Sequence, residues 1–202
     1  MADIKMSGSG QMFKNPYLER LTKTHISIPL TLFYGAAVAA IIYTVIYTEI
    51  PVVEIIGMVL AGMISWTVLE YFFHRYLFHI AEFNPKLEKL QYTLHGIHHE
   101  YPRDKMRLAM PPVVSIILAT GFFALFYLIF GMYGFSFGAG FVAAYASYLL
   151  VHYSVHAFIA PNNLLRKLWT HHNIHHYKDP KSAFGVSSPL WDYVFGTMPK
   201  KY

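Results

Sequence analysis

The chain contains no cysteine. This absence excludes disulfides, iron–sulfur clusters and every metal or haem site that depends on a thiolate ligand. A metal, if the protein holds one, must therefore be bound by imidazole or carboxylate groups. The redox compartment cannot be deduced from thiols either.

Charged residues are scarce as well. They make up 13% of the 202 residues, whereas hydrophobic residues make up 55%. A soluble domain of this size normally carries about twice that charged fraction. The length suits one domain, but the apolar residues come in runs too long for a soluble core. We expect no cleavable signal peptide.

Four segments are apolar over the roughly 20 helical residues that a bilayer span requires. They cover residues 26–48, 50–73, 111–132 and 135–155. Only short turns join the first segment to the second and the third to the fourth, so each pair is predicted to form a helical hairpin. The predicted fold is therefore all-α, an integral membrane protein with four transmembrane helices. Residues 1–25 form a separate, flexible amino-terminal segment that we expect to carry no chemistry.

The basic residues define the predicted topology. All 16 lysines and arginines lie in residues 1–25, in the stretch 75–110 or in the tail 156–202, and none lies in a hairpin turn. Because basic residues favour the cytoplasmic side, both termini and a histidine-rich helical cap made of 75–110 and 156–202 are predicted to be cytoplasmic. The net charge of +5 is thus a topology signal, and we expect no nucleic-acid partner.

Histidine is the enriched residue type, and eleven of the 12 histidines form four clusters between residues 74 and 176. Residues three or four apart on a helix share a face, so each closely spaced cluster is predicted to point at one centre. His74 and His79 are five apart and fit only from opposite flanks, or if the helix ends between them. Ten imidazoles suit two ions with about five ligands each. The ten candidate ligands are His74, His79, His95, His98, His99, His152, His156, His172, His175 and His176.

Other residues are candidates to support these ligands. Glu70 precedes His74 by four residues and is predicted to orient that ring. Asp104, Asp192 and His171 are further candidates to hydrogen-bond the ligating rings, as are Glu100 and Asp179. Isolated His25 is expected to be an ordinary surface residue.

Two stretches are predicted to lie on the membrane surface. Residues 85–94 and 162–169 place leucines at helical spacing opposite charged side chains. Both could roof a site that is supplied from the membrane. Leu168 and Trp169 are candidates for the substrate path, because Trp169 lies three residues before His172.

The order of the histidine clusters resembles the fatty acid hydroxylase superfamily. Three stretches, residues 70–79, 95–112 and 175–197, look like the fatty acid 2-hydroxylases that act on sphingolipids. The resemblance covers about residues 16–197 and assigns residues 26–202 to the hydroxylase domain. It implies a monooxygenase that uses two iron ions, dioxygen and two electrons to hydroxylate carbon 2 of the acyl chain of a ceramide or free fatty acid. The family's ten ligands fall on the same ten histidines.

The resemblance also implies partners and a location. Zinc is expected to replace iron in purified protein, because nitrogen sites favour later metals over ferrous iron. Many relatives carry an amino-terminal cytochrome b5 domain, for which we expect this chain to have no room. A separate cytochrome b5 or ferredoxin-type protein is then the expected electron donor. The expected location is the endoplasmic reticulum membrane in a eukaryote or the inner membrane in a bacterium.

Three alternatives stay open at this point. Sister enzymes, which oxidise sterols, carotenoids or alkylglycerols, share the histidine clusters. A histidine-rich metal-binding or transport protein would place polar groups near the bilayer midplane, yet the first, third and fourth spans have no charged residue in their interiors. A bis-histidine haem protein would need histidine pairs within the helices, and the sequence offers none there.

Overall fold

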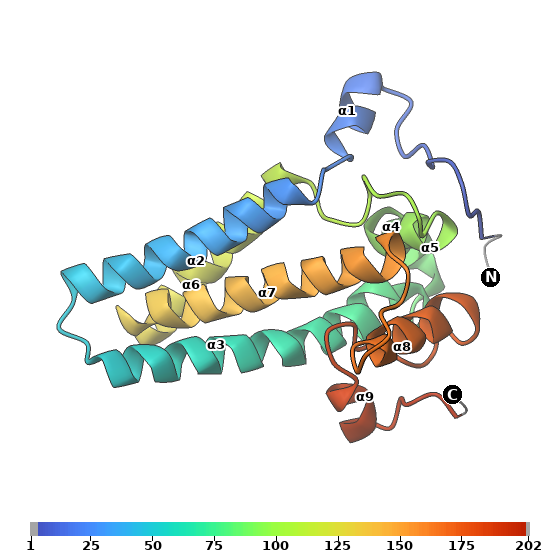
Figure 1. Cartoon of the computed structure of the whole chain (residues 1–202). Helices are drawn as coiled ribbons and strands as arrows, with labels where there is room; N and C mark the ends of the chain where they lie inside the picture. The colour runs from blue at the N-terminus through green and yellow to red at the C-terminus, as the bar shows by residue number, and fades with distance from the viewer. Residues whose placement is uncertain (1–3, 201–202) are drawn as a thin grey trace. The chain divides into compact units, whose positions relative to one another are not determined.

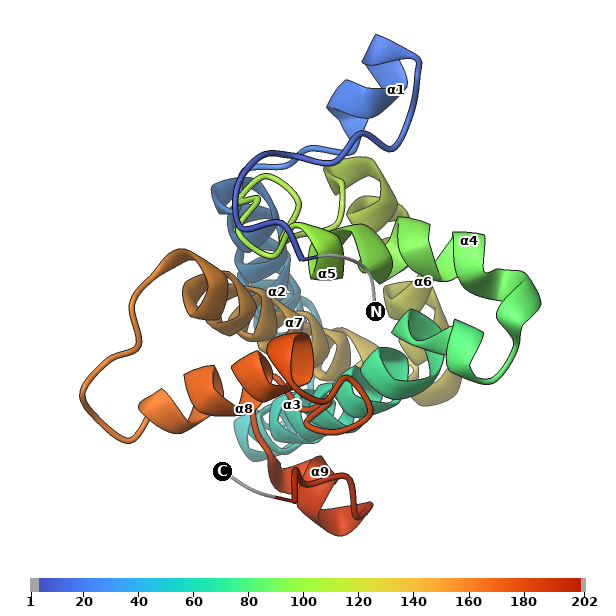
Figure 2. The same ribbon diagram turned by 90° about the vertical axis from the view of Figure 1, so that its right-hand side faces the viewer.

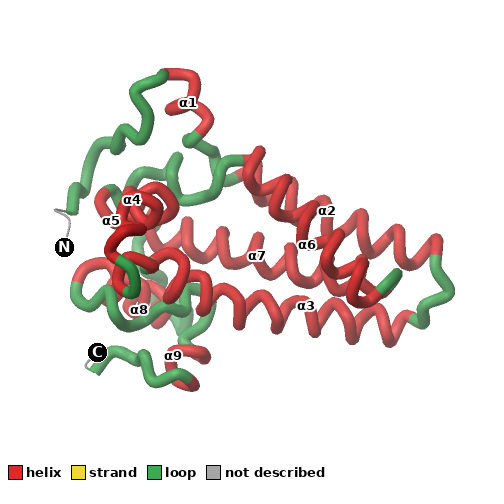
Figure 3. Tube along the Cα trace, turned by 180° about the vertical axis from the view of Figure 1, so that it is seen from behind, coloured by secondary structure: helices red, strands yellow, loops and turns green. Residues whose placement is uncertain are grey.

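The structure, a computed structural model, describes residues 4–200. These residues form helices and loops, and no strand occurs among them, as Figures 1 and 3 show. The predicted all-α class is therefore confirmed. The described residues fall into two compact units. We call residues 24–67 and 109–150 the span unit, and residues 4–23, 68–108 and 151–200 the histidine unit.

The span unit contains the apolar helices that the sequence predicted. They are α2 (Ser27–Tyr47), α3 (Val52–Phe72), α6 (Pro112–Phe130) and α7 (Tyr133–Ala157), and the ends of α3 and α7 belong to the histidine unit. All four are long and apolar enough to cross a membrane, and the candidate span that begins with α3 extends to Phe78. The chain is thus an integral membrane protein with four spans, as predicted.

Close backbone contact and aromatic packing hold the span unit together. A methyl group on Gly62 would clash with the carbonyl oxygen of Phe137, and one on Gly140 would clash with that of Val59. Glycine at these two positions therefore lets α3 and α7 touch, which is how helices associate where lipid removes the hydrophobic driving force. Trp66 packs edge-on against Phe141, with ring centroids 5.3 Å apart.

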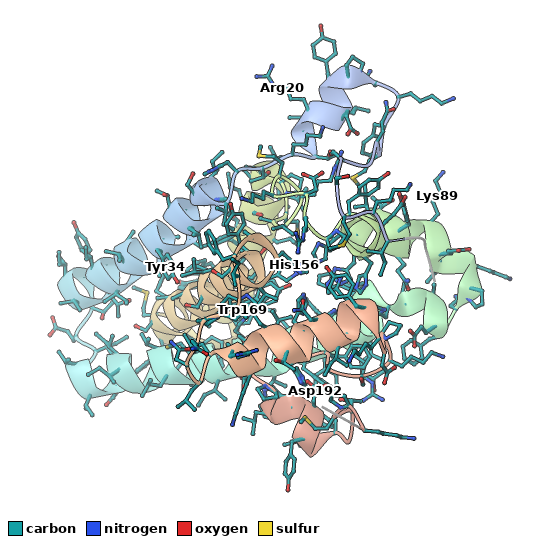
Figure 4. All side chains as sticks on the ribbon, turned by 45° about the vertical axis from the view of Figure 1, so that its right-hand side comes forward. Arg20, Tyr34, Lys89, His156, Trp169 and Asp192 are labelled. Atoms are coloured by element: carbon teal, nitrogen blue, oxygen red, sulfur yellow. The ribbon has the colours of Figure 1, made fainter. Side chains whose placement is uncertain are left out.

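The histidine unit consists of short helices around the ends of α3 and α7. A π-helical turn, η1 (Phe73–Phe78), continues α3, and it is followed by the 3-10 turns η2 (Ile80–Glu82) and η3 (Pro85–Leu87). Next come α4 (Glu88–Gln91), a second π-helical turn η4 (Tyr92–Gly96) and α5 (Ile97–Glu100). The tail supplies α8 (Arg166–Tyr177) and α9 (Leu190–Val194), which lie side by side in Figures 2 and 4.

The amino-terminal segment is folded into the histidine unit. It contains α1 (Pro16–Leu21), which Asn15 caps by accepting hydrogen bonds from the backbone of the first turn. The buried guanidinium of Arg107 donates to Gly10 O and to Thr22 Oγ1, each at 2.7 Å, and pairs with Glu19. The sequence predicted a flexible stretch, and the structure differs because a buried cation requires these acceptors.

Candidate metal centre

The ten histidines predicted as ligands come together in two groups of five. Within each group, one ring nitrogen from every member lies within 4.8 Å of the others, and nine of the ten residues are buried. The first histidine group consists of His74, His79, His95, His99 and His175. The second histidine group consists of His98, His152, His156, His172 and His176. Both groups lie inside the histidine unit.

A π-helical turn explains how His74 and His79 reach the same group. In a π-helix the backbone bonds link residues five apart, so such residues share a face, which an ideal α-helix does not allow. His74 lies inside η1, and His79 follows its last residue with φ −113° and ψ 31°. Single π-turns are frequent at functional sites, and η4, which carries His95, is a second one here.

Each His-x-x-His-His triplet is divided between the two groups. The sequence predicted that all three members would face one centre, and this was wrong for both triplets. His95 and His99 belong to the first group while His98 belongs to the second; in α8 the pattern is reversed, with only His175 in the first group. Adjacent residues on a helix point about 100° apart, so they face different centres. The triplets therefore tie the two groups together.

Within each group the Nε2 atoms face one another at short range. The separations are 3.1 Å for His79–His175, 3.2 Å for His74–His95, 3.1 Å for His98–His176, 3.0 Å for His98–His152 and 2.8 Å for His156–His172. Two nitrogens that bind one ion at right angles, each about 2.1 Å away, lie about 3.0 Å apart. The observed spacing fits that arrangement.

Hydrogen bonds and burial decide which nitrogen carries the proton. His74 Nδ1 donates to Phe184 O at 2.5 Å, and His175 Nδ1 donates to Ser182 O at 2.8 Å, because a carbonyl can only accept. Burial lowers the pKa of His175 to about 3 and that of His79 to about 4, so these rings are neutral near pH 7. The Nε2 atoms of His74 and His175 therefore carry lone pairs, and these face the Nε2 atoms of His95 and His79 at 3.2 and 3.1 Å. Such an arrangement is stabilised by a cation, so the donor set fits a metal ion.

The residues predicted to support the ligands act mainly through a loop. Asp192 in α9 accepts hydrogen bonds from the backbone N–H groups of Phe184 and Gly185 and from His171 Nε2. Burial raises the pKa of Asp192, but its hydrogen bonds, with that from His171 the largest, outweigh burial and hold the pKa below its usual value. The Asp192 carboxylate is therefore ionised.

Glu70 was predicted to orient the His74 ring directly, and here the structure differs. Its carboxylate accepts hydrogen bonds from the backbone N–H groups of Val186 and Ser187, at 2.8 and 2.9 Å. Because His74 Nδ1 donates to Phe184 O, Glu70 acts on this ring only through the loop that contains Phe184, Val186 and Ser187.

The remaining candidates bond groups other than the ligating rings. Asp104 pairs with Arg107, and Glu100 pairs with Lys5. The Asp179 carboxylate accepts from the backbone of Lys181. Exposed His25 bonds the hydroxyl of Ser27.

Trp169 and Leu168 lie near the start of α8. Trp169 donates from Nε1 to Phe158 O at 3.1 Å, so it closes the loop that joins α7 to α8. Figure 4 labels Trp169 together with His156, the ligand candidate at the end of α7. Leu168 is half-buried on the same helix.

A pocket of about 630 Å³ opens onto both histidine groups. Its walls combine imidazole rings with other polar side chains: His79, His95, His99, His176, Glu82, Glu88, Gln91, Tyr92, Lys178 and Lys181. Three of these residues belong to the stretch 85–94 that the sequence predicted as part of a roof. Leu168 and Trp169 do not line this pocket.

Several contacts could not be identified from the sequence. The carbonyl groups of Leu108, Ser182 and Phe184 hold ring nitrogens, but every residue has a carbonyl, so the sequence gives no signal for them. Tyr92 and Gln91 were seen only as members of an amphipathic stretch. For the Ser182 carbonyl, the sequence offers one hint: Ser182 follows His175 by only seven residues, so the two can lie close together.

Comparison with known proteins gives consistent results. The profile described as fatty acid hydroxylase matches residues 59–197. The ceramide very long chain fatty acid hydroxylase scs7 of Schizosaccharomyces pombe is 41% identical over 201 residues, which cover 95% of this chain and 55% of that protein. The fatty acid 2-hydroxylase of Rattus norvegicus is 36% identical over 155 residues, 74% of this chain and 41% of that protein.

A solved structure is also similar. It is described as full-length scs7p with only the hydroxylase domain visible, and it matches with a TM-score of 0.86 and 34% identity over 96% of this chain and 73% of that chain. The present chain spans about half the length of the curated relatives that it matches. The resemblance predicted from the histidine clusters is confirmed by these matches.

Proposed function

Because this chain belongs to the fatty acid hydroxylase family, we propose that it is a membrane monooxygenase that hydroxylates carbon 2 of a lipid's acyl chain. The substrate is a ceramide or a free fatty acid. The names of the relatives support this choice, since they describe hydroxylases of ceramide, dihydroceramide and fatty acids. The observation that carries the proposal is the pair of five-histidine groups with facing ring nitrogens.

The reaction requires an oxidant and a reductant. One carbon–hydrogen bond of the acyl chain breaks and one carbon–oxygen bond forms, while the second oxygen atom of dioxygen leaves as water after accepting two electrons and two protons. Two iron ions, one for each histidine group, supply the activation of dioxygen when bound. Zinc can occupy the same nitrogen sites but supplies no redox chemistry. The electrons come from a separate carrier of the cytochrome b5 or ferredoxin type.

The chain's own residues prepare the site for this reaction. Burial keeps the rings neutral, so the ligand atoms do not have to release protons before an ion binds. The carbonyl groups of Phe184 and Ser182 hold the rings of His74 and His175 in the tautomer that leaves Nε2 free to bind. Residues 4–23 pack around Arg107 and contribute no member of either histidine group. We therefore assign the hydroxylase domain to residues 26–202.

The substrate path has two proposed parts. The carbonyl end of the lipid enters the pocket beside Tyr92 and Gln91, where ligands of both groups are within reach. Leu168 and Trp169 form the second part, at the loop that joins two ligand-bearing helices. Exposing an acyl chain to water costs about 0.8 kcal/mol of free energy for each methylene group. The part of the path that holds the acyl chain therefore has to be apolar. Replacing Trp169 by Asp should lower turnover at equal protein level and equal metal content, and unchanged turnover would remove Trp169 and Leu168 from the path.

The positions of the basic residues support a cytoplasmic site, in the endoplasmic reticulum membrane of a eukaryote or the inner membrane of a bacterium. Cysteine variants at Glu49 and Tyr133, in or next to the hairpin turns, test this orientation. Labelling of both positions from the cytoplasmic side would contradict it.

Expression in cells that lack their own 2-hydroxylase tests the activity. Mass spectrometry of the sphingolipids and free fatty acids should reveal 2-hydroxylated acyl chains that disappear when dioxygen is withheld. Hydroxylated sterols or carotenoids with unchanged acyl chains would instead assign the protein to a sister activity.

A further inference from the structure

The two histidine groups differ in how their rings are held from behind. In the first group, His74 Nδ1 donates to Phe184 O and His175 Nδ1 donates to Ser182 O, at 2.5 and 2.8 Å. A second hydrogen bond on the non-ligating nitrogen fixes the ring and makes the ligating nitrogen more basic. Two ligand candidates of the first group therefore have strong outer partners.

The loop that supplies these carbonyl groups is itself rigidly anchored. Fully buried Asp192 accepts from the N–H groups of Phe184 and Gly185, at 2.8 and 2.7 Å, and from His171 and Thr197, at 2.9 and 2.7 Å. A Cβ atom on Gly185 would clash with the backbone carbonyl oxygen of Ser188 at 2.1 Å and would meet an Asp192 oxygen at 2.9 Å, so only glycine fits at this point of the loop.

A second buried carboxylate holds the other half of the loop. Glu70 accepts from the N–H groups of Val186 and Ser187 and from the Ser187 hydroxyl. Ala183, which lies between Ser182 and Phe184, adopts φ 57°, a backbone conformation that a residue with a side chain rarely takes. This conformation persists because the contacts around it are strong, so residues 182–187 form a fixed bracket behind the first histidine group.

The second histidine group has no comparable bracket. The Nδ1 atoms of His98, His172 and His176 are buried and have no hydrogen-bond partner among the residues that the structure describes. His152 Nδ1 does meet Leu108 O, but at 3.3 Å this hydrogen bond is longer than those of the first group. Three of its five rings thus lack an outer hydrogen bond on Nδ1, whereas in the first group one buried ring nitrogen, His99 Nε2, has no partner among the described residues.

We infer that the two metal sites are unequal: the first histidine group retains its ion, and the second histidine group releases its ion first. Glu70 and Asp192 are positioning residues for the retained ion, acting through the bracket on His74 and His175. Removal of an outer partner typically weakens metal binding about 10- to 100-fold. The inference rests on the metal-binding part of the proposed function.

Zinc release from the full-length protein in detergent tests this inference. The protein is saturated with zinc, excess metal is removed, and transfer of zinc to a coloured chelator is followed with time. The wild type should release one ion at least about tenfold faster than the other. Asp192→Asn replaces one acceptor oxygen by a donor, so it should accelerate release of the slow ion and leave the fast ion unchanged.

Two further variants make the result specific. Ser187→Ala removes one hydrogen bond to Glu70 and should accelerate the slow ion by a smaller factor in a chain that still folds. Glu54→Gln is the matched control, because Glu54 lies in the span unit and bonds Tyr133; both release rates should stay at the wild-type values.

The outcomes separate the inference from the proposed function. Equal release rates for two ions in the wild type, or acceleration of only the fast ion in Asp192→Asn and Ser187→Ala, would overturn the inference and leave the hydroxylase proposal standing. Binding of fewer than two zinc ions at saturation would overturn both.

Discussion

The span unit and the histidine unit are stabilised by different kinds of contact. In the span unit, α3 and α7 touch at Gly62 and Gly140, and aromatic rings such as Trp66 fill the space around them. In the histidine unit, most of the buried side chains are polar, and several of them are held by partners far away in the chain, as Glu70 is by Val186 and Arg107 by Gly10. The apolar unit thus depends on the shape of its helices, whereas the polar unit depends on specific pairs of atoms.

The largest expected effect separates chemistry from membrane insertion. His176→Ala removes a ring whose Nε2 lies 3.1 Å from that of His98, so the second histidine group should lose its ion and hydroxylation should stop. Insertion should continue, because it depends on the apolar spans. His25→Ala is the control, since the exposed His25 side chain bonds Ser27, outside both histidine groups, and its removal should leave activity intact. Wild-type turnover by His176→Ala would exclude this ring as an essential ligand.

The next effect concerns the contact between helices in the span unit. Gly140→Ala places a methyl group against the backbone of Val59, so we expect a loss of stability of about 1–3 kcal/mol and a lower protein level. Gly57→Ala is matched to it, because, apart from its chain neighbours and the backbone of its own helix, no atom of residues 4–200 lies within 4 Å of a Cβ atom placed there. Thermal unfolding in detergent compares the two variants, and equal midpoints would contradict the close approach of α3 and α7.

Acid should weaken the histidine unit of the metal-free protein. Burial lowers the pKa of His79 to about 4 and that of His175 to about 3, from 6.5 in an exposed ring. Above pH 6.5 these two rings are neutral in both the folded and the unfolded protein. As the pH falls from 6.5 to about 4, the unfolded chain binds protons that the folded chain does not, so the free energy of unfolding decreases by up to about 1.4 kcal/mol per pH unit for each ring. Below about pH 3 the loss levels off.

Tryptophan fluorescence can follow this pH effect in the histidine unit alone. A Trp66→Phe variant retains Trp169 and Trp191, which both lie in the histidine unit. The midpoint of unfolding of the chelator-treated variant should decrease as the pH is lowered from 6.5 to 4. A midpoint that is constant over this range would show that the rings are accessible to protons in the folded state.

A smaller effect is expected where the amino-terminal segment docks. Arg107→Ala removes the donors to Gly10 O and Thr22 Oγ1, so residues 4–23 should become sensitive to protease at a cost of about 1–3 kcal/mol. Arg20→Ala is the control, because Arg20 points outward from α1 in Figure 4. Hydroxylation should persist in both variants. Equal protease resistance of both variants would show that Arg107 does not hold the segment.

The sequence predicted the features that depend on local patterns. The four spans were recognisable from their length and hydropathy, and the ten histidines from their spacing in short motifs. The division of His95, His98 and His99 between two groups was not predicted, because it depends on a neighbouring helix that supplies the other ligands. Likewise, the contact of Glu70 with Val186 joins residues more than a hundred positions apart, and no local pattern encodes such a pair.

Oxygen incorporation by the purified, iron-loaded protein tests the proposed hydroxylation most directly. The protein is supplied with a long-chain ceramide, or with the free fatty acid in parallel, together with a reduced one-electron carrier and ¹⁸O₂. The wild type should form a product with a single ¹⁸O atom on carbon 2 of the acyl chain, and His176→Ala should form no such product. Unlabelled, unchanged lipid from a protein that retains two iron ions and accepts electrons would contradict the proposed hydroxylation.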